Sequence, residues 1–204
     1  MAAFFGNLRN VVIASFVLAV LLIFLFAHLD GGFNPDSFGP FVLRWLHITA
    51  GVMWIGLLWY FNFVQMPTMP KIPDELKPAV GKFIAPAALF YFRMAAATTV
   101  LLGILLAWHN GYLVQAYTLG ASEGFVAPRN IFIGIGMWLG TIMAYNVWFV
   151  IWPNQQKALN IGGKYPDLAA ADKAAAGKTA MIFSRINTLL SVPMLLSMAA
   201  MSHF

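Results

Sequence analysis

Apolar residues dominate five stretches of this 204-residue chain, at about residues 10–29, 40–64, 84–109, 130–152 and 180–203. A lipid hydrocarbon core is about 30 Å thick, so a helix needs roughly 20 residues to cross it. Apolar residues make up 61% of the chain and charged residues 9%, as is typical of integral membrane proteins. We therefore expect an all-α protein, in which five transmembrane helices form a single membrane domain over residues 1–204.

Two polar breaks separate these stretches. Residues 66–82 contain four prolines and charges of both signs, and they predict an interfacial loop with at most a short helix. Residues 153–178 begin with PNQQK and become rich in alanine, and they predict a short surface helix with Pro166 near its start.

The basic residues indicate how the chain crosses the membrane. One set of loops and the N-terminus carry Arg9, Lys71, Lys77, Lys82, Lys157, Lys164, Lys173 and Lys178. The opposite loops carry Arg129 together with Asp30, Asp36 and Glu123. The positive-inside rule then predicts a cytoplasmic N-terminus and a periplasmic C-terminus in a bacterial inner membrane. The net charge of +5 favours contact with anionic lipid headgroups rather than with nucleic acid.

All four histidines fall toward the predicted outer face: His28, His47, His109 and His203. His47 is the most deeply set, roughly 10 Å inside its helix at 1.5 Å per residue. An ionisable group at that depth is costly unless it is paired or ligated, and imidazole is a common ligand of haem iron. A b-type haem would need a second axial ligand from a facing helix, for which His203 and His109 are the candidates and His203 is preferred.

The residues around His47, in RWLHITAGVMWIG, suit a planar cofactor. Gly51 lies one turn further along the same helix face and leaves a flat gap for a macrocycle. Arg44 lies one turn toward the outer surface and is placed to pair with a propionate. The alternative is structural, with His47 bonded to a neighbouring helix and Gly51 permitting close helix packing.

Two further groups of side chains allow both a functional and a structural interpretation. Asn62, Arg93, Asn146, Arg185 and Asn187 lie toward the cytoplasmic side, where they would line a pocket for an anionic or quinone-like molecule or join helices by hydrogen bonds. Met66, Met69, Met194, Met198 and Met201 supply thioethers that bind Cu(I) but also fill gaps in apolar packing. The chain has no cysteine, which excludes iron–sulfur ligation and c-type haem attachment.

Four stretches carry a resemblance to a known family: FVLRWLHITAGVMWIGLLWYF (41–61), FYFRMAAATTVLLGILLAW (90–108), MAYNVWFVIWPNQQK (143–157) and RINTLLSVPMLLSMAAMSHF (185–204). In this order they resemble the membrane domain of the PuuD-type urate oxidases, also called urate hydroxylases. The resemblance covers roughly residues 40–204. The WLH…G…WIG pattern is shared more loosely with CopD-like copper-resistance proteins and HemJ-type protoporphyrinogen oxidases.

The resemblance implies a helical bundle that works with a C-terminal cytochrome c domain on the outer side in the oxidation of urate. His47 matches the histidine of the family's WLH segment, and His203 matches that of its final segment. The chain ends at Phe204, before a cytochrome c domain, and its loop after the second span lacks a longer insertion with glycine and histidine. We therefore do not assign urate oxidation to this chain by itself.

Three functions follow as hypotheses. The first is a membrane redox component, an oxidoreductase of the urate hydroxylase type if it is an enzyme, that holds haem b near the periplasmic face and passes electrons to a cytochrome c or a neighbouring subunit. The second is a non-catalytic accessory subunit of a larger respiratory or photosynthetic membrane complex. The third is metal handling of the CopD-like kind.

Overall fold

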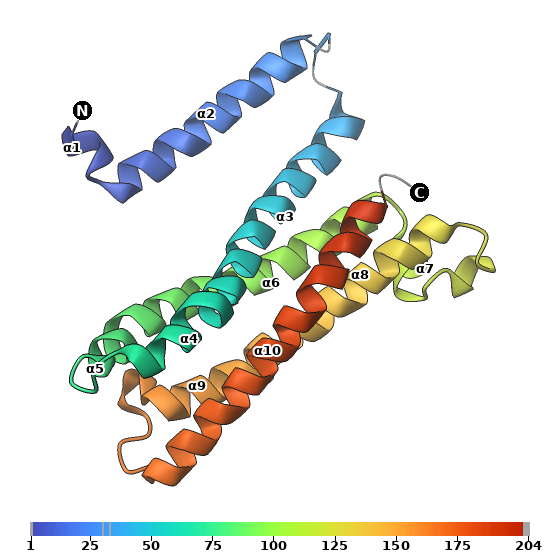
Figure 1. Ribbon diagram of the computed structural model, residues 1–204. Coiled ribbons are helices and arrows are strands. Elements are labelled where there is room, and N and C mark those ends of the chain that lie inside the picture. The colour runs from blue at the N-terminus through green and yellow to red at the C-terminus, as the bar shows by residue number, and fades with distance from the viewer. Residues whose placement is uncertain (1, 30, 33, 202–204) are drawn as a thin grey trace. The chain divides into compact units, whose positions relative to one another are not determined.

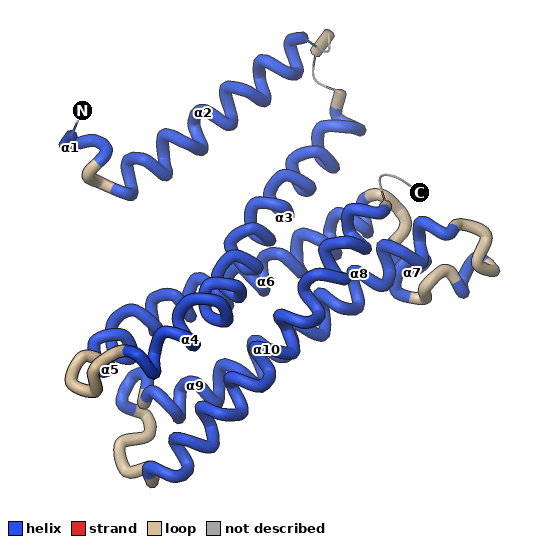
Figure 2. Tube along the Cα trace, viewed as in Figure 1, coloured by secondary structure: helices blue, strands red, loops and turns tan. Residues whose placement is uncertain are grey.

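The computed structural model describes residues 2–29, 31–32 and 34–201, which form helices joined by turns without any strand among them (Figure 2). Five helical segments are long and apolar enough to cross a membrane: Leu8–Leu29, Asp36–Lys71, Lys77–His109, Pro128–Leu159 and Ala170–Ala200. The predicted all-α fold class and five spans are confirmed. The orientation of the termini across the membrane stays a prediction from the lysine distribution.

The chain divides into two compact units, residues 1–42 and residues 43–204. The first unit contains α1 (Ala2–Phe5), α2 (Leu8–Leu29) and the beginning of α3 (Pro35–Trp59). The side-chain oxygens of Asn7 and Asn34 accept hydrogen bonds, both of 3.0 Å, from the backbone N–H groups of Arg9 and Asp36. Such contacts satisfy donors that the first turn of a helix leaves unpaired, and they account for where α2 and α3 begin.

The second unit begins within α3 and holds the other long helices (Figure 1). In chain order its elements are η1 (Tyr60–Gln65), α4 (Met66–Thr68), η2 (Met69–Lys71), α5 (Lys77–Ala79), η3 (Val80–Ile84), α6 (Ala85–His109), α7 (Leu113–Tyr117), η4 (Ala121–Glu123), α8 (Pro128–Tyr145), η5 (Asn146–Ile151), α9 (Trp152–Leu159), η6 (Ile161–Gly163) and α10 (Ala170–Ala200). Helix α10 packs along α8 and α9, and both α6 and α7 pack against α8.

The core of the second unit lies midway along these helices. Its fully buried side chains include Trp54, Leu58, Leu89, Phe92, Met143, Val147 and Ile151. Phe61 and Phe92 join α6 to the chain just beyond α3, with ring centroids 5.6 Å apart at nearly right angles, an arrangement that aromatic pairs favour. Buried side chains of α3 and α6 belong to the same cluster, which positions the residues of the site described below.

Both polar breaks are more helical than the sequence predicts. The loop predicted over residues 66–82 contracts to residues 72–76. Pro67 and Pro70 lie in short helical elements that extend the second span to Lys71, and Pro78 lies in the first turn of α5, where proline's missing N–H costs no hydrogen bond. The surface helix predicted within residues 153–178 is also wrong. Helix α9 continues the fourth span, Pro166 lies in a loop, and the alanine-rich stretch is the first part of α10.

Candidate functional site

A hydrogen bond between helices fixes the ring of His47. Its Nδ1 lies 2.8 Å from the backbone carbonyl oxygen of Thr99, on α6, and the side chain is half-buried. A carbonyl oxygen only accepts hydrogen bonds, so Nδ1 must carry the proton and donate it. The neutral ring then has its lone pair on Nε2, which is the tautomer that a metal-ligating histidine adopts when a carbonyl holds its other nitrogen.

Glycines on both helices shape the surroundings of this ring. A Cβ atom at Gly103 would lie 2.9 Å from Cε1 and 3.1 Å from Nδ1 of His47, so the ring occupies the space that only a glycine leaves on α6. A Cβ atom at Gly51 would lie 3.7 Å from the methyl carbon of Thr99. The gap expected beside Gly51 is therefore filled by Thr99, and the glycine that accommodates the imidazole is Gly103, which the sequence analysis did not single out.

A small cavity of about 50 Å³ adjoins His47, and we call it the His47 cavity. Its lining is His47, Trp54, Thr99, Val100, Gly103, Ile104, Tyr117, Met137, Gly140, Thr141, Met194 and Met198. Trp54 is 1% exposed, and its Nε1 has no hydrogen-bond partner. The hydroxyls of Tyr117 and Thr141 bond to each other at 3.0 Å. The cavity thus combines one imidazole with three thioethers, from Met137, Met194 and Met198.

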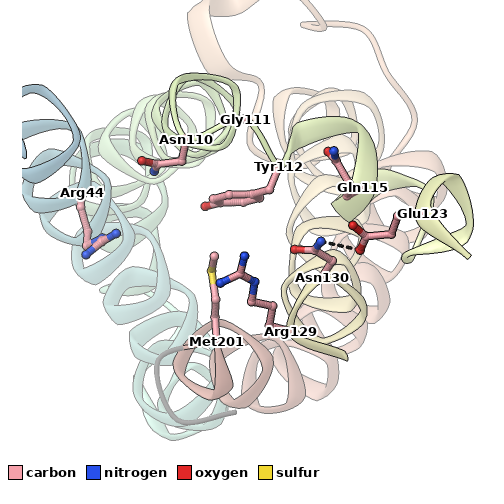
Figure 3. A pocket seen from close by; sticks show the side chains of 9 residues that line it. All are labelled: Arg44, Asn110, Gly111, Tyr112, Gln115, Glu123, Arg129, Asn130 and Met201. Atoms are coloured by element: carbon pink, nitrogen blue, oxygen red, sulfur yellow. Dashed lines mark hydrogen bonds between the residues drawn. The ribbon is translucent and has the colours of Figure 1, made fainter. Parts of the chain in front are cut away.

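A larger cavity of about 330 Å³, here called the outer pocket, lies where α3, α6, α8 and α10 meet α7 (Figure 3). It is lined by Arg44, Asn110, Gly111, Tyr112, Gln115, Glu123, Arg129, Asn130 and Met201. Arg44, the expected propionate partner, therefore faces this pocket together with Arg129. Sequence reasoning missed Tyr112, Gln115 and Asn130, which lie on the turn after α6, on α7 and at the start of α8, because nothing local predicts that these segments converge.

Tyr112 in the outer pocket is neutral because it is partly buried. Burial raises the pKa of Tyr112, although the positive charge of Arg44 and a hydrogen bond with Asn110 oppose the rise. The hydroxyl therefore stays protonated at neutral pH and remains able to donate a hydrogen bond.

The other predicted histidines do not join His47 among the described residues. His109 is exposed at the end of α6, and His28 is exposed near the end of α2 in the first unit. His203 lies outside the described residues. Within the part of the chain that the structure describes, no three His, Cys, Asp or Glu side chains come together to hold a metal ion.

The asparagines expected in an inner polar pocket connect helices. Asn62 donates to Ser184 of α10 at 2.8 Å, and Asn146 donates to the side-chain oxygen of Asn187 at 2.9 Å. Asn187 donates in turn to the carbonyl of Met143 at 2.9 Å. These contacts favour the structural interpretation, in which polar side chains join neighbouring helices.

The two arginines of the expected inner pocket differ from each other. Arg93 lies against the rings of Trp148 and Trp152, with its guanidinium carbon 5.6 and 3.2 Å from their centroids. The indole faces attract the cation and partly replace the water that it loses. Arg185 is exposed on α10. The structure thus accounts for Arg93 by a cation–π contact and gives Arg185 no such contact.

Comparison with known proteins gives one match. A family model described as "Urate oxidase N-terminal" matches residues 83–204, which is more than half of the chain. The match covers α6 to α10, with His109, Arg129 and His203, while His47 and Arg44 on α3 precede it. No curated protein and no solved structure matches the chain.

Proposed function

The chain belongs to the urate oxidase N-terminal family, and on that premise we propose that it is a membrane redox component in which His47 ligates the iron of a b-type haem. The observation that carries this proposal is the hydrogen bond from Nδ1 of His47 to the carbonyl of Thr99. It leaves Nε2 unprotonated and fixes the orientation of the ring, as a metal-ligating histidine requires. A bound haem would supply a one-electron redox centre.

The residues around His47 fit such a group in their chemistry. The His47 cavity, at about 50 Å³, is smaller than the cavities that enclose small-molecule cofactors, so a macrocycle on Nε2 requires its wall to move. That wall includes Met137, Met194 and Met198, whose unbranched side chains repack more readily than other apolar residues. Arg44, expected from the sequence to pair with a propionate, lines the outer pocket and not the His47 cavity, so this proposal does not depend on it.

In this proposal His203, which by resemblance corresponds to the histidine in the family's final segment, would supply a second ligand to the iron. Electrons would then pass to a periplasmic cytochrome c or to a neighbouring subunit. In this arrangement, the protein residues hold and orient the cofactor. Thr99 keeps the proton on Nδ1, and Gly103 leaves room for the ring.

Haem content in matched histidine variants tests the proposal. Purified protein should contain about one b-type haem per chain, His47→Ala should lose it, and His109→Ala should keep it, because His109 is exposed at the end of α6. A pyridine haemochrome assay measures the haem, and His203→Ala tests the second ligand. Equal haem in the His47 and His109 variants would refute the assignment. A colourless, folded protein that co-purifies stoichiometrically with other membrane subunits would instead support an accessory role.

One observation favours a second candidate function, the binding of a soft metal ion. The His47 cavity brings an imidazole together with the thioethers of Met137, Met194 and Met198, and thioether and imidazole ligands suit Cu(I). Copper bound anaerobically to colourless protein, and lost in a Met194→Leu/Met198→Leu double variant, would support this function. Copper uptake that is unchanged in that variant and in His47→Ala would exclude it.

A further inference from the structure

The outer pocket has features of a binding site that is distinct from the His47 cavity. The two cavities share no lining residue. At about 330 Å³, the outer pocket lies at the lower end of the range for sites that bind small organic molecules. Its position, at the end of the helices rather than among them, makes it accessible to a water-soluble molecule or to a lipid headgroup.

Positive charge in the outer pocket comes from two helices. Arg44 on α3 and Arg129 on α8 approach it from different sides (Figure 3). Neither guanidinium forms a hydrogen bond or a salt bridge with a residue that the structure describes. Glu123 is the acidic residue in the lining, so these three side chains together carry a charge of +1. Unpaired guanidiniums facing one cavity favour an anion whose oxygens they can bind.

Asn130 adds a requirement that an anion alone does not meet. It is 4% exposed, and its Nδ2 donates a hydrogen bond to Glu123. That bond fixes the orientation of the amide, and Oδ1 has no partner while it points into the space toward Tyr112 and Arg129 (Figure 3). A buried acceptor without a partner is unfavourable. A ligand that satisfied Asn130 would have to donate a hydrogen bond.

We propose that the outer pocket binds an oxyanion that carries its own hydrogen-bond donor, such as hydrogen phosphate. The oxygens would meet Arg44 and Arg129, and the O–H would meet Oδ1 of Asn130. The Tyr112 hydroxyl can donate one further bond to the anion. An anion without a donor, such as sulfate, would leave Oδ1 of Asn130 unpaired.

Phosphate and sulfate form a matched pair of probes for this site. We expect saturable binding of inorganic phosphate to the purified full chain in titration calorimetry at neutral pH, where phosphate still carries an O–H. Sulfate should bind roughly tenfold or more weakly, because it cannot donate to Asn130. Equal binding of the two anions, or no saturable binding of phosphate, would overturn the proposal.

Variants separate this site from general attraction between charges. Arg129→Gln should weaken phosphate binding roughly tenfold or more, whereas Arg185→Gln removes the same charge from a position on α10 outside the pocket and should leave binding unchanged. Asn130→Leu should remove the preference for phosphate over sulfate. If that variant does not fold, phosphate binding by Arg129→Gln and the preference of the wild-type protein for phosphate over sulfate still test the proposal. Equal binding by the Arg129 and Arg185 variants would refute the site.

Two further experiments identify the source of the anion and separate this site from the haem site. In nanodiscs that contain phosphatidic acid, a phosphate monoester lipid, occupancy by the headgroup should abolish binding of free phosphate, whereas a site for a soluble anion should still bind it. The second experiment uses His47→Ala, which should lack haem but retain phosphate binding, so the two proposals fail separately. If adding haem to the wild-type protein displaced phosphate, the pocket would be a propionate site and this inference would be wrong.

Discussion

Replacing Gly103 with alanine tests whether the position of the His47 ring matters. The added Cβ would lie 2.9 Å from Cε1 of His47, and ordinary contacts begin near 3.4 Å, so the ring must move by about 0.5 Å. The same movement stretches the bond of 2.8 Å from Nδ1 to Thr99. Overpacking costs about 1–3 kcal/mol, and a weakened hydrogen bond about 1 kcal/mol. We expect a total of about 2–4 kcal/mol.

Gly140→Ala is the matched control for this variant. Gly140 lines the same cavity, but a Cβ there meets nothing within 4 Å. Both substitutions gain similar helix propensity, about 1 kcal/mol, so the difference between them isolates the contact with His47. Because 1.4 kcal/mol corresponds to a factor of ten in an equilibrium constant, Gly103→Ala should hold haem roughly tenfold or more weakly than Gly140→Ala.

The assay has two readouts. Haem retention is measured by the pyridine haemochrome method after dilution in detergent, and the redox midpoint potential by titration with visible spectroscopy. Gly103→Ala should change both, and Gly140→Ala should change neither beyond the effect of a smaller cavity. If the two variants held haem equally and had the same potential, the ring of His47 would not be set by Gly103, and the reasoning would be refuted.

Two further substitutions test the packing that supports the site. Gly134→Ala should lower the melting temperature in detergent, because its Cβ would collide with the backbone carbonyl of Ala116 on α7. Gly56→Ala is the control, because a Cβ there meets nothing within 4 Å, and it should not lower the melting temperature. Similar melting temperatures for the two variants would argue against the close approach of α7 to α8. Asn187→Ala should lower the free energy of unfolding by about 1–2 kcal/mol, because Asn187 is fully buried and donates a hydrogen bond to the carbonyl of Met143. A change in the free energy of reversible unfolding below about 0.3 kcal/mol would show that this hydrogen bond contributes little.

Hydropathy predicted the five spans because each apolar run must satisfy its backbone internally and face lipid or other helices. The helix ends were less predictable. Proline clusters usually mark loops, but here Pro67 and Pro70 lie in the last part of the second span, and Pro78 lies in the first turn of α5. The sequence shows proline spacing but not which turn each proline begins, so the loop over 66–82 was predicted too long.

Depth in the membrane identified His47, but the sequence could not give its neighbours. Thr99 and Gly103 are more than 50 positions away and meet His47 only because α3 packs on α6. The outer pocket is also non-local. Arg44 was predicted from its spacing to His47, whereas Asn130 has a meaning only once its amide is seen bonded to Glu123 with its oxygen unpaired.

The reduced-minus-oxidised visible spectrum of the purified wild-type protein shows directly whether the protein binds haem. We predict the spectrum of a b-type haem, at about one per chain by pyridine haemochrome. That result would make the free Nε2 of His47 the ligand to examine in the variants. A folded protein with no haem absorbance, even after incubation with haem in mild detergent, would contradict the claim.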